Sequence, residues 1–105
     1  MTAITGSIAA PDAIAAVESG TGWLLDVRED VEWQAGHAPG AHHIPMGEIG
    51  RRQDELPAGE TILVICHVGG RSRVVTDALL AADYPAANVE GGMDAWQAAG
   101  GPVLR

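Results

Sequence analysis

Residues 62–73 read ILVICHVGGRSR and contain the only cysteine of the chain, Cys66. The first half is a short, branched, apolar run, which is typical of a strand buried on both faces of a parallel sheet. The second half carries two glycines and two arginines and leads into a helical pattern. The segment therefore predicts a strand, a sharp turn and a helix, with the thiol at the carboxyl end of the strand.

Short apolar runs and helical patterns alternate on both sides of this segment. Residues 23–27 (WLLDV) form a second buried-strand pattern, and weaker strand patterns cover residues 3–8, 42–45 and 87–91. Helices are predicted over residues 12–18, 31–35, 47–56, 72–83 and 94–99. In the fourth helix one apolar stripe is predicted from Val74, Val75, Ala78, Leu79 and Ala82. This alternation predicts an α/β fold, a parallel sheet with helices on both faces.

Size and charge restrict the classes of function. The 105 residues are expected to form one domain over residues 1–105, and the net charge of −8 argues against nucleic acid or an anionic membrane as a partner. No apolar run reaches the roughly 20 residues that span a bilayer. The N-terminal residues do not resemble a signal peptide, and a lone cysteine forms no internal disulfide, so a cytoplasmic location is expected.

The surroundings of Cys66 favour a reactive thiol. Open α/β sheets place their ligands at the carboxyl ends of the strands, where Cys66 lies. Gly69 and Gly70 are expected to supply positive φ angles, so that backbone N–H groups converge on an anion. A helix start and a nearby arginine lower a cysteine pKa from its usual value of about 8.5. The alternative is a small buried side chain without chemistry, which is common for a single cysteine.

Three motifs in the chain resemble those of one family. The loop CHVGGRS resembles the C-x-x-G-x-R-S loop of rhodanese-like sulfurtransferases. Upstream, LLDVREDVEWQAGHAPGAHHIP is similar to the first conserved stretch of that family, and downstream VEGGMDAWQAAGGPV is similar to its last. The resemblance covers roughly residues 8–103. It implies a three-layer sandwich of a five-stranded parallel sheet with helices on both faces.

The resemblance also implies a mechanism. Cys66 would be the catalytic nucleophile that takes a sulfur atom from a donor such as thiosulfate, becomes a persulfide, and passes the sulfur to cyanide or a thiol. The substrate-binding loop would consist of His67, Val68, Gly69, Gly70, Arg71 and Ser72. Arg71 would hold the anionic donor or the charge of the persulfide. No cofactor is expected, and the donor or acceptor could be a small molecule or a protein.

Other polar residues are given structural roles. Asp26 and Arg28 lie on one side of the second strand, and we expect them, with His37, to support the loop. Adjacent His42 and His43 point to opposite faces of a strand, and the histidine spacing matches no zinc site, so no metal is predicted. Trp33 and Trp96 are expected in the core.

Two other functions compete with sulfur transfer. Related phosphatases use a longer loop with the arginine six positions after the cysteine, whereas here Arg71 stands at the fifth, which disfavours phosphatase or arsenate chemistry. A rhodanese-like persulfide carrier or regulatory binding module without thiosulfate turnover stays open.

Overall fold

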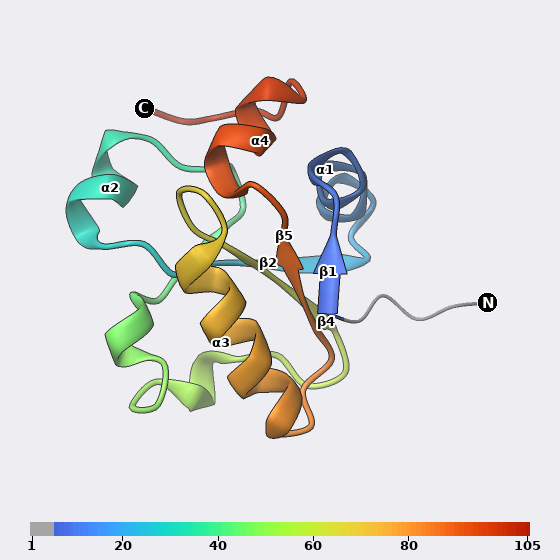
Figure 1. Ribbon diagram of the computed structural model, residues 1–105, viewed down its shortest axis with the longest axis vertical. Coiled ribbons are helices and arrows are strands. Elements are labelled where there is room, and N and C mark those ends of the chain that lie inside the picture. The colour runs from blue at the N-terminus through green and yellow to red at the C-terminus, as the bar shows by residue number, and fades with distance from the viewer. Residues whose placement is uncertain (1–5) are drawn as a thin grey trace.

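The computed structural model describes residues 6–105, which form a five-stranded parallel sheet flanked by helices (Figure 1). The order of the strands in the sheet is β1-β5-β4-β2-β3. The strands are β1 (Gly6–Ile8), β2 (Gly22–Asp26), β3 (His42–His43), β4 (Thr61–Ile65) and β5 (Ala86–Val89). The helices are α1 (Ala10–Ser19), α2 (Asp30–Ala35), α3 (Gly70–Ala81) and α4 (Gly92–Ala98), with short 3-10 turns η1 (Met46–Glu48) and η2 (Gln53–Glu55).

Strand β4 lies at the centre of the sheet and is buried on both faces. Its residues alternate between two apolar clusters: Leu63 and Ile65 pack with α1 and α4, while Ile62 and Val64 pack with α3. Successive side chains of a strand point to opposite faces, so an uninterrupted apolar run fills both layers. The predicted α/β sheet covered on both faces is confirmed. Among the described residues, no helix has the length and apolar character needed to cross a bilayer.

Helix α3 begins earlier and is rotated relative to the prediction. It starts at Gly70, and its buried residues are Ser72, Val75, Thr76 and Leu79. Val74, expected in the apolar stripe, is 56% exposed. The Thr76 hydroxyl donates a hydrogen bond of 2.7 Å to the Ser72 carbonyl, so this polar side chain is satisfied beneath the helix. Two polar residues therefore occupy the face that periodicity assigned to apolar ones.

The predicted helix over residues 47–56 is wrong. The segment instead forms the 3-10 turns η1 and η2, which are separated near Gly50. Glycine weakens a helix, and Arg52 at the start of η2 has a non-helical backbone. The Arg52 guanidinium binds both Glu48 of η1 and Glu55 of η2 and so joins the two turns. For the predicted strand over residues 3–8, the described part, Gly6–Ile8, is β1; residues 3–5 lie outside the described residues.

Candidate active site

The Cys66 side chain lies at the carboxyl end of β4, enclosed by the loop that leads into α3. Its sulfur accepts a hydrogen bond from the Gly69 backbone N–H at 3.1 Å and lies 3.2 Å from the Ser72 hydroxyl oxygen. The residue is only 1% exposed and belongs to the apolar cluster on the α3 side. The sulfur is thus covered by the loop and packed against apolar side chains, but it also has two polar partners.

Two opposing effects set the pKa of Cys66. Burial acts to raise it, because a thiolate is poorly solvated inside a protein. Hydrogen bonds from the Ser72 hydroxyl and from the backbone N–H groups of Ser72, Gly69 and Val68 act to lower it, and together they outweigh burial. The pKa of Cys66 therefore lies below its ordinary value, which favours the thiolate form that acts as a nucleophile.

The turn of the loop depends on Gly69 but not on Gly70. Gly69 has a φ of +108°, and a Cβ built on it would lie 3.4 Å from the Gly91 backbone nitrogen. Gly70 is the first residue of α3, so the expectation that it also needs a positive φ is wrong. The Asn88 side chain of β5 donates to the Gly69 carbonyl at 3.3 Å. The left-handed turn is thus held from the neighbouring strand.

The first turn of α4 supports the loop from the other side. The Met93 N–H donates to the Cys66 carbonyl at 2.8 Å, and the Asp94 N–H donates to the His67 carbonyl at 3.2 Å. Gly92 has a φ of +58°, and a Cβ there would collide with the carbonyl oxygens of Cys66 and His67. The VEGGM motif therefore has a physical reason: its glycine lets α4 approach the reactive loop closely.

Arg71 is bound to an acidic residue of a distant segment, which no sequence motif connects to it. Its guanidinium makes a two-pronged ion pair with Glu32 of α2, including a contact of 2.8 Å between Nη2 and Oε2. The hydrogen bond from Arg71 lowers the pKa of Glu32 to about 2, and the pair raises that of Arg71. The thiolate charge of Cys66 also contributes to this rise. The two residues are 39 positions apart, so no local spacing rule could predict the pair.

Asp26 and Arg28 form a buried ion pair at the carboxyl end of β2. Arg28 Nη2 lies 2.8 Å from Asp26 Oδ2 and donates to the Gly36 carbonyl at 2.7 Å. The His37 ring stacks on Trp33 with ring centroids 3.6 Å apart, and His43 also stacks on Trp33 at 4.6 Å. Trp33 is thus partly exposed between two histidines, and its expected place in the core is wrong. Trp96 is in the core as expected.

The remaining loop residues face outward. His67 Nε2 lies 3.0 Å from Asp94 Oδ1, and Val68 is 62% exposed. Arg73 points away from Cys66, binding Asp77 and the Gly6 carbonyl. Within residues 6–105, no three His, Cys, Asp or Glu side chains are grouped as metal ligands.

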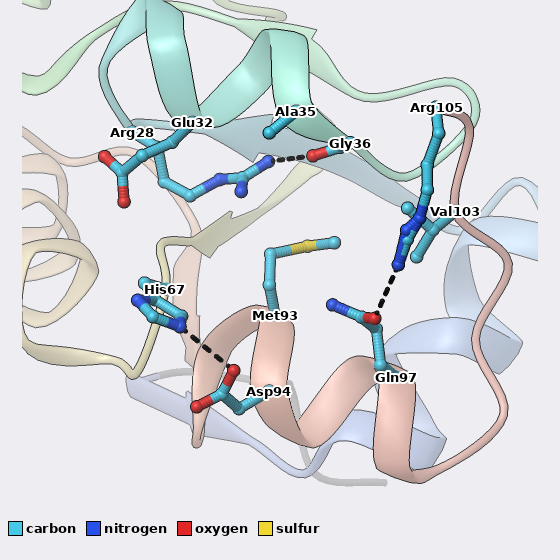
Figure 2. Close-up of a pocket in the computed structure, with 10 residues that line it drawn as sticks. All are labelled: Arg28, Glu32, Ala35, Gly36, His67, Met93, Asp94, Gln97, Val103 and Arg105. Carbon is cyan, nitrogen blue, oxygen red and sulfur yellow. Dashed lines mark hydrogen bonds and ion pairs between the residues drawn. The ribbon is translucent and has the colours of Figure 1, made fainter.

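A cavity of about 230 Å³ lies beside the loop (Figure 2). Its walls come from α2, the start of α4 and the residues near Arg105, and His67 and Glu32 border it on the side of the loop. Cys66 is not part of its lining. Glu32 therefore connects the cavity to the Cys66 loop, because it lines the cavity and forms the ion pair with Arg71.

The amino-acid sequence of this chain is similar to those of known proteins. The family model described as a rhodanese-like domain matches residues 9–99. The proposed sulfurtransferase YtwF of Bacillus subtilis (strain 168) is 41% identical over 75 residues, which are 71% of this chain and 73% of YtwF. The proposed sulfur carrier protein YrkF of the same bacterium is 39% identical over 74 residues, which are 70% of this chain but only 40% of YrkF.

A solved structure has the same fold. A rhodanese-related protein from Thermoplasma volcanium has a TM-score of 0.87 and 30% sequence identity, and the match covers 94% of this chain and 97% of that one. The five-stranded sandwich expected from the motifs is thus confirmed.

Proposed function

Because the chain belongs to the rhodanese-like domain family, a family of sulfur-transfer proteins, we propose that Cys66 carries a sulfur atom as a persulfide between a donor and an acceptor. The donor class is a sulfane-sulfur anion such as thiosulfate, and the acceptor is a thiol, or cyanide in an assay. In this proposal the loop from His67 to Ser72 binds the transferred sulfur, and Asp26, Arg28 and His37 support the loop.

One observation carries this proposal. The Cys66 sulfur is surrounded by the Gly69 N–H and the Ser72 hydroxyl at 3.1 and 3.2 Å, and hydrogen bonds lower its pKa despite burial. A thiol that only fills the core needs no such donors. Donors fixed around a sulfur stabilise a negative charge there without reorganisation, which suits a nucleophile and the anion of a persulfide.

The proposed cycle has two covalent steps. The Cys66 thiolate attacks the outer sulfur of thiosulfate, the bond between the two sulfurs of thiosulfate breaks, and sulfite leaves with the electron pair. A nucleophilic acceptor then takes the outer sulfur of the persulfide, and Cys66 leaves as a thiolate. The chain has one cysteine, so no second thiol of the same chain can accept the sulfur.

Arg71 has to change partner for the first step in this scheme. An anionic donor would replace the Glu32 carboxylate on the guanidinium, next to the loop that covers Cys66. The influence of the thiolate charge on the Arg71 pKa supports a position of Arg71 close enough to act on the sulfur. This exchange of partners would bring the donor to the loop. It would also break the ion pair that joins α2 to the loop.

Thiocyanate formation from thiosulfate and cyanide tests the proposal. The native chain should turn over, and Cys66→Ser should not, while circular dichroism shows the same folded state. Arg51→Gln is a matched control, because Arg51 is an exposed arginine paired with Glu48 outside the loop. Turnover by Cys66→Ser equal to that of the native chain would refute the role of Cys66.

A persulfide carrier loaded by another protein is the second candidate. The burial of Cys66 favours it, since free thiosulfate has to pass the covering loop, and the relative YrkF is named a sulfur carrier. For a carrier, loading by a protein persulfide would be fast and thiosulfate turnover negligible. Phosphatase chemistry is disfavoured, because Arg71 is the fifth residue after the cysteine; hydrolysis of an aryl phosphate should stay at background.

A further inference from the structure

The cavity beside the loop contains a buried cationic donor that the proposed cycle does not use. Arg28 Nε and Nη2 bind Asp26, and Nη2 also binds the Gly36 carbonyl, whereas Nη1 has no hydrogen bond to any described residue. The Arg28 side chain is 8% exposed and lines the cavity. Figure 2 shows its guanidinium directed into this space, above Met93. Nη1 is not among the buried unpaired atoms of the described residues, so it is accessible from the cavity, and an acceptor atom of a ligand can replace water on this charged donor.

The charges around the cavity also favour an anion. Of the two acidic residues of the lining, Glu32 is neutralised by its ion pair with Arg71, and Asp94 Oδ1 lies 3.0 Å from His67 Nε2 on the side of the loop. On the opposite wall, the only hydrogen-bond partner of the Arg105 guanidinium in the described part of the chain is the neutral Gln97 amide, at 3.1 Å. Arg105 is therefore a cation of the lining that has no carboxylate partner among residues 6–105, although the chain as a whole carries −8.

The size of the cavity limits the ligand to a small molecule. Its volume of about 230 Å³ is below the roughly 300–1,000 Å³ of pockets for drug-sized ligands. Besides the polar groups, Ala35, Met93 and Val103 provide apolar walls. These features fit a short carbon chain that ends in a carboxylate.

We propose that this cavity binds the carboxylate of a low-molecular-weight thiol that accepts sulfur from Cys66. This inference rests on the proposed function. Arg28 Nη1 and Arg105 hold the carboxylate, and the thiol reaches past Glu32 toward the loop. The acceptor loses its thiol proton to water, and its thiolate attacks the outer, protonated sulfur of the persulfide. The bond between the two persulfide sulfurs breaks and Cys66 leaves as a thiolate. The acceptor sulfur is oxidised to a persulfide, and Cys66 is reduced.

The transfer test compares two acceptors on protein that has been loaded with sulfur and freed of donor. One is 3-mercaptopropionate, which has a carboxylate, and the other is 2-mercaptoethanol, which has none. In Arg105→Gln, at a subsaturating acceptor concentration, we expect the rate of sulfur transfer to 3-mercaptopropionate to fall about tenfold, because one charge-assisted hydrogen bond is lost. We expect the rate of transfer to 2-mercaptoethanol to change less than about twofold. Equal effects on both acceptors, or none, would overturn the proposal. Arg51→Gln is the control for a general effect of charge.

A binding test does not depend on turnover. In Cys66→Ser, the unreactive 3-(methylthio)propionate should shift the backbone NMR signals of Gly36 and Gln97, and Arg105→Gln in the same background should remove these shifts. Shifts elsewhere only, or shifts that survive in the Arg105 variant, would contradict the site. If the ligand binds in this way but no persulfide forms on the native chain, the proposed function fails and the carboxylate site remains.

Discussion

At the scale of single residues, the charge of the Cys66 sulfur is controlled by donors from its own loop. The Ser72 hydroxyl is the largest of the contributions that lower the pKa, ahead of the backbone N–H groups. Ser72 is completely buried, so water cannot take its place without a rearrangement. The hydroxyl is also the one donor of the set that mutation can remove while the backbone stays intact.

Ser72→Ala should therefore raise the pKa of Cys66. Because the folded-state pKa is depressed, the native thiol is ionised at a pH at which the variant is still protonated. We expect slower alkylation of the variant by iodoacetamide at neutral pH, and equal rates at a pH above the ordinary cysteine pKa, where both are thiolates. Thr76→Ser, which keeps a hydroxyl in the next turn of α3, is the control. Identical pH profiles for Ser72→Ala and the native chain would contradict this account of the thiolate.

Arg71 and Glu32 should affect donor use in opposite directions. Arg71→Ala removes the charge proposed to hold the anionic donor, which should cost on the order of 1.5–3 kcal/mol, or roughly 10- to 100-fold in kcat/KM for thiosulfate. Glu32→Gln removes the competing carboxylate, so KM for thiosulfate should fall. Steady-state kinetics of both variants make the comparison. A rise of KM in Glu32→Gln would mean that Glu32 positions Arg71 and does not compete with the donor.

At the scale of elements, the reactive loop is held between α3 and the start of α4. The N–H groups of Met93 and Asp94 bind the carbonyls of Cys66 and His67, and this approach requires glycine at position 92. The carbonyls of Cys66 and His67 are thus used for support, while the N–H groups of Val68, Gly69 and Ser72 act on the sulfur.

Gly92→Ala should displace α4 from the loop. The added Cβ meets two backbone carbonyls, which cannot rotate away as a side chain could, so we expect a loss of stability of about 1–3 kcal/mol and slower loading of Cys66. Urea denaturation and the rate of persulfide formation measure the two effects. Gly100→Ala is the matched control, since Gly100 has a φ of +84° but open space around it. If both variants behaved alike, the close approach of α4 would not matter.

The sequence predicts those elements whose patterns are local and strong. The runs that became β2 and β4 are apolar on both sides of the pleat, and Gly20 ends α1 at a φ of +77°. The helix over residues 47–56 failed because the backbone leaves helical geometry at Arg52 and the glycines at positions 47 and 50 weaken a helix, although Arg52, Glu48 and Glu55 have the spacing of helical ion pairs. In the site, the sequence indicated the place of Cys66 and the turn at Gly69. The Glu32–Arg71 pair and the support by Gly92 join distant segments, and only the packed fold brings them together.

At the scale of the whole molecule, one sheet separates two apolar clusters. Trp96 belongs to the cluster with α1 and α4, and Trp23 packs against the cluster with α3. Because β4 contributes side chains to both, neither cluster can lose its packing without exposing the other. We propose on this basis that residues 1–105 fold as a single domain.

A single domain should unfold in one step. Two variants, one retaining only Trp23 and one retaining only Trp96 with phenylalanine at the other tryptophan positions, report on the two clusters separately. In each variant, the urea transition followed by tryptophan fluorescence should coincide with the transition followed by circular dichroism. A fluorescence transition that precedes the loss of secondary structure in either variant would show that its cluster unfolds independently.

The most direct test of the central claim is the intact mass of the protein after incubation with thiosulfate and removal of the excess. The account predicts that the native chain gains the mass of one sulfur atom, that a thiol reductant removes this gain, and that Cys66→Ser gains nothing. A native chain that is folded but never gains that mass with thiosulfate, with a low-molecular-weight persulfide or with a protein persulfide, or a Cys66→Ser variant that gains it equally, would contradict the claim that Cys66 carries the sulfur.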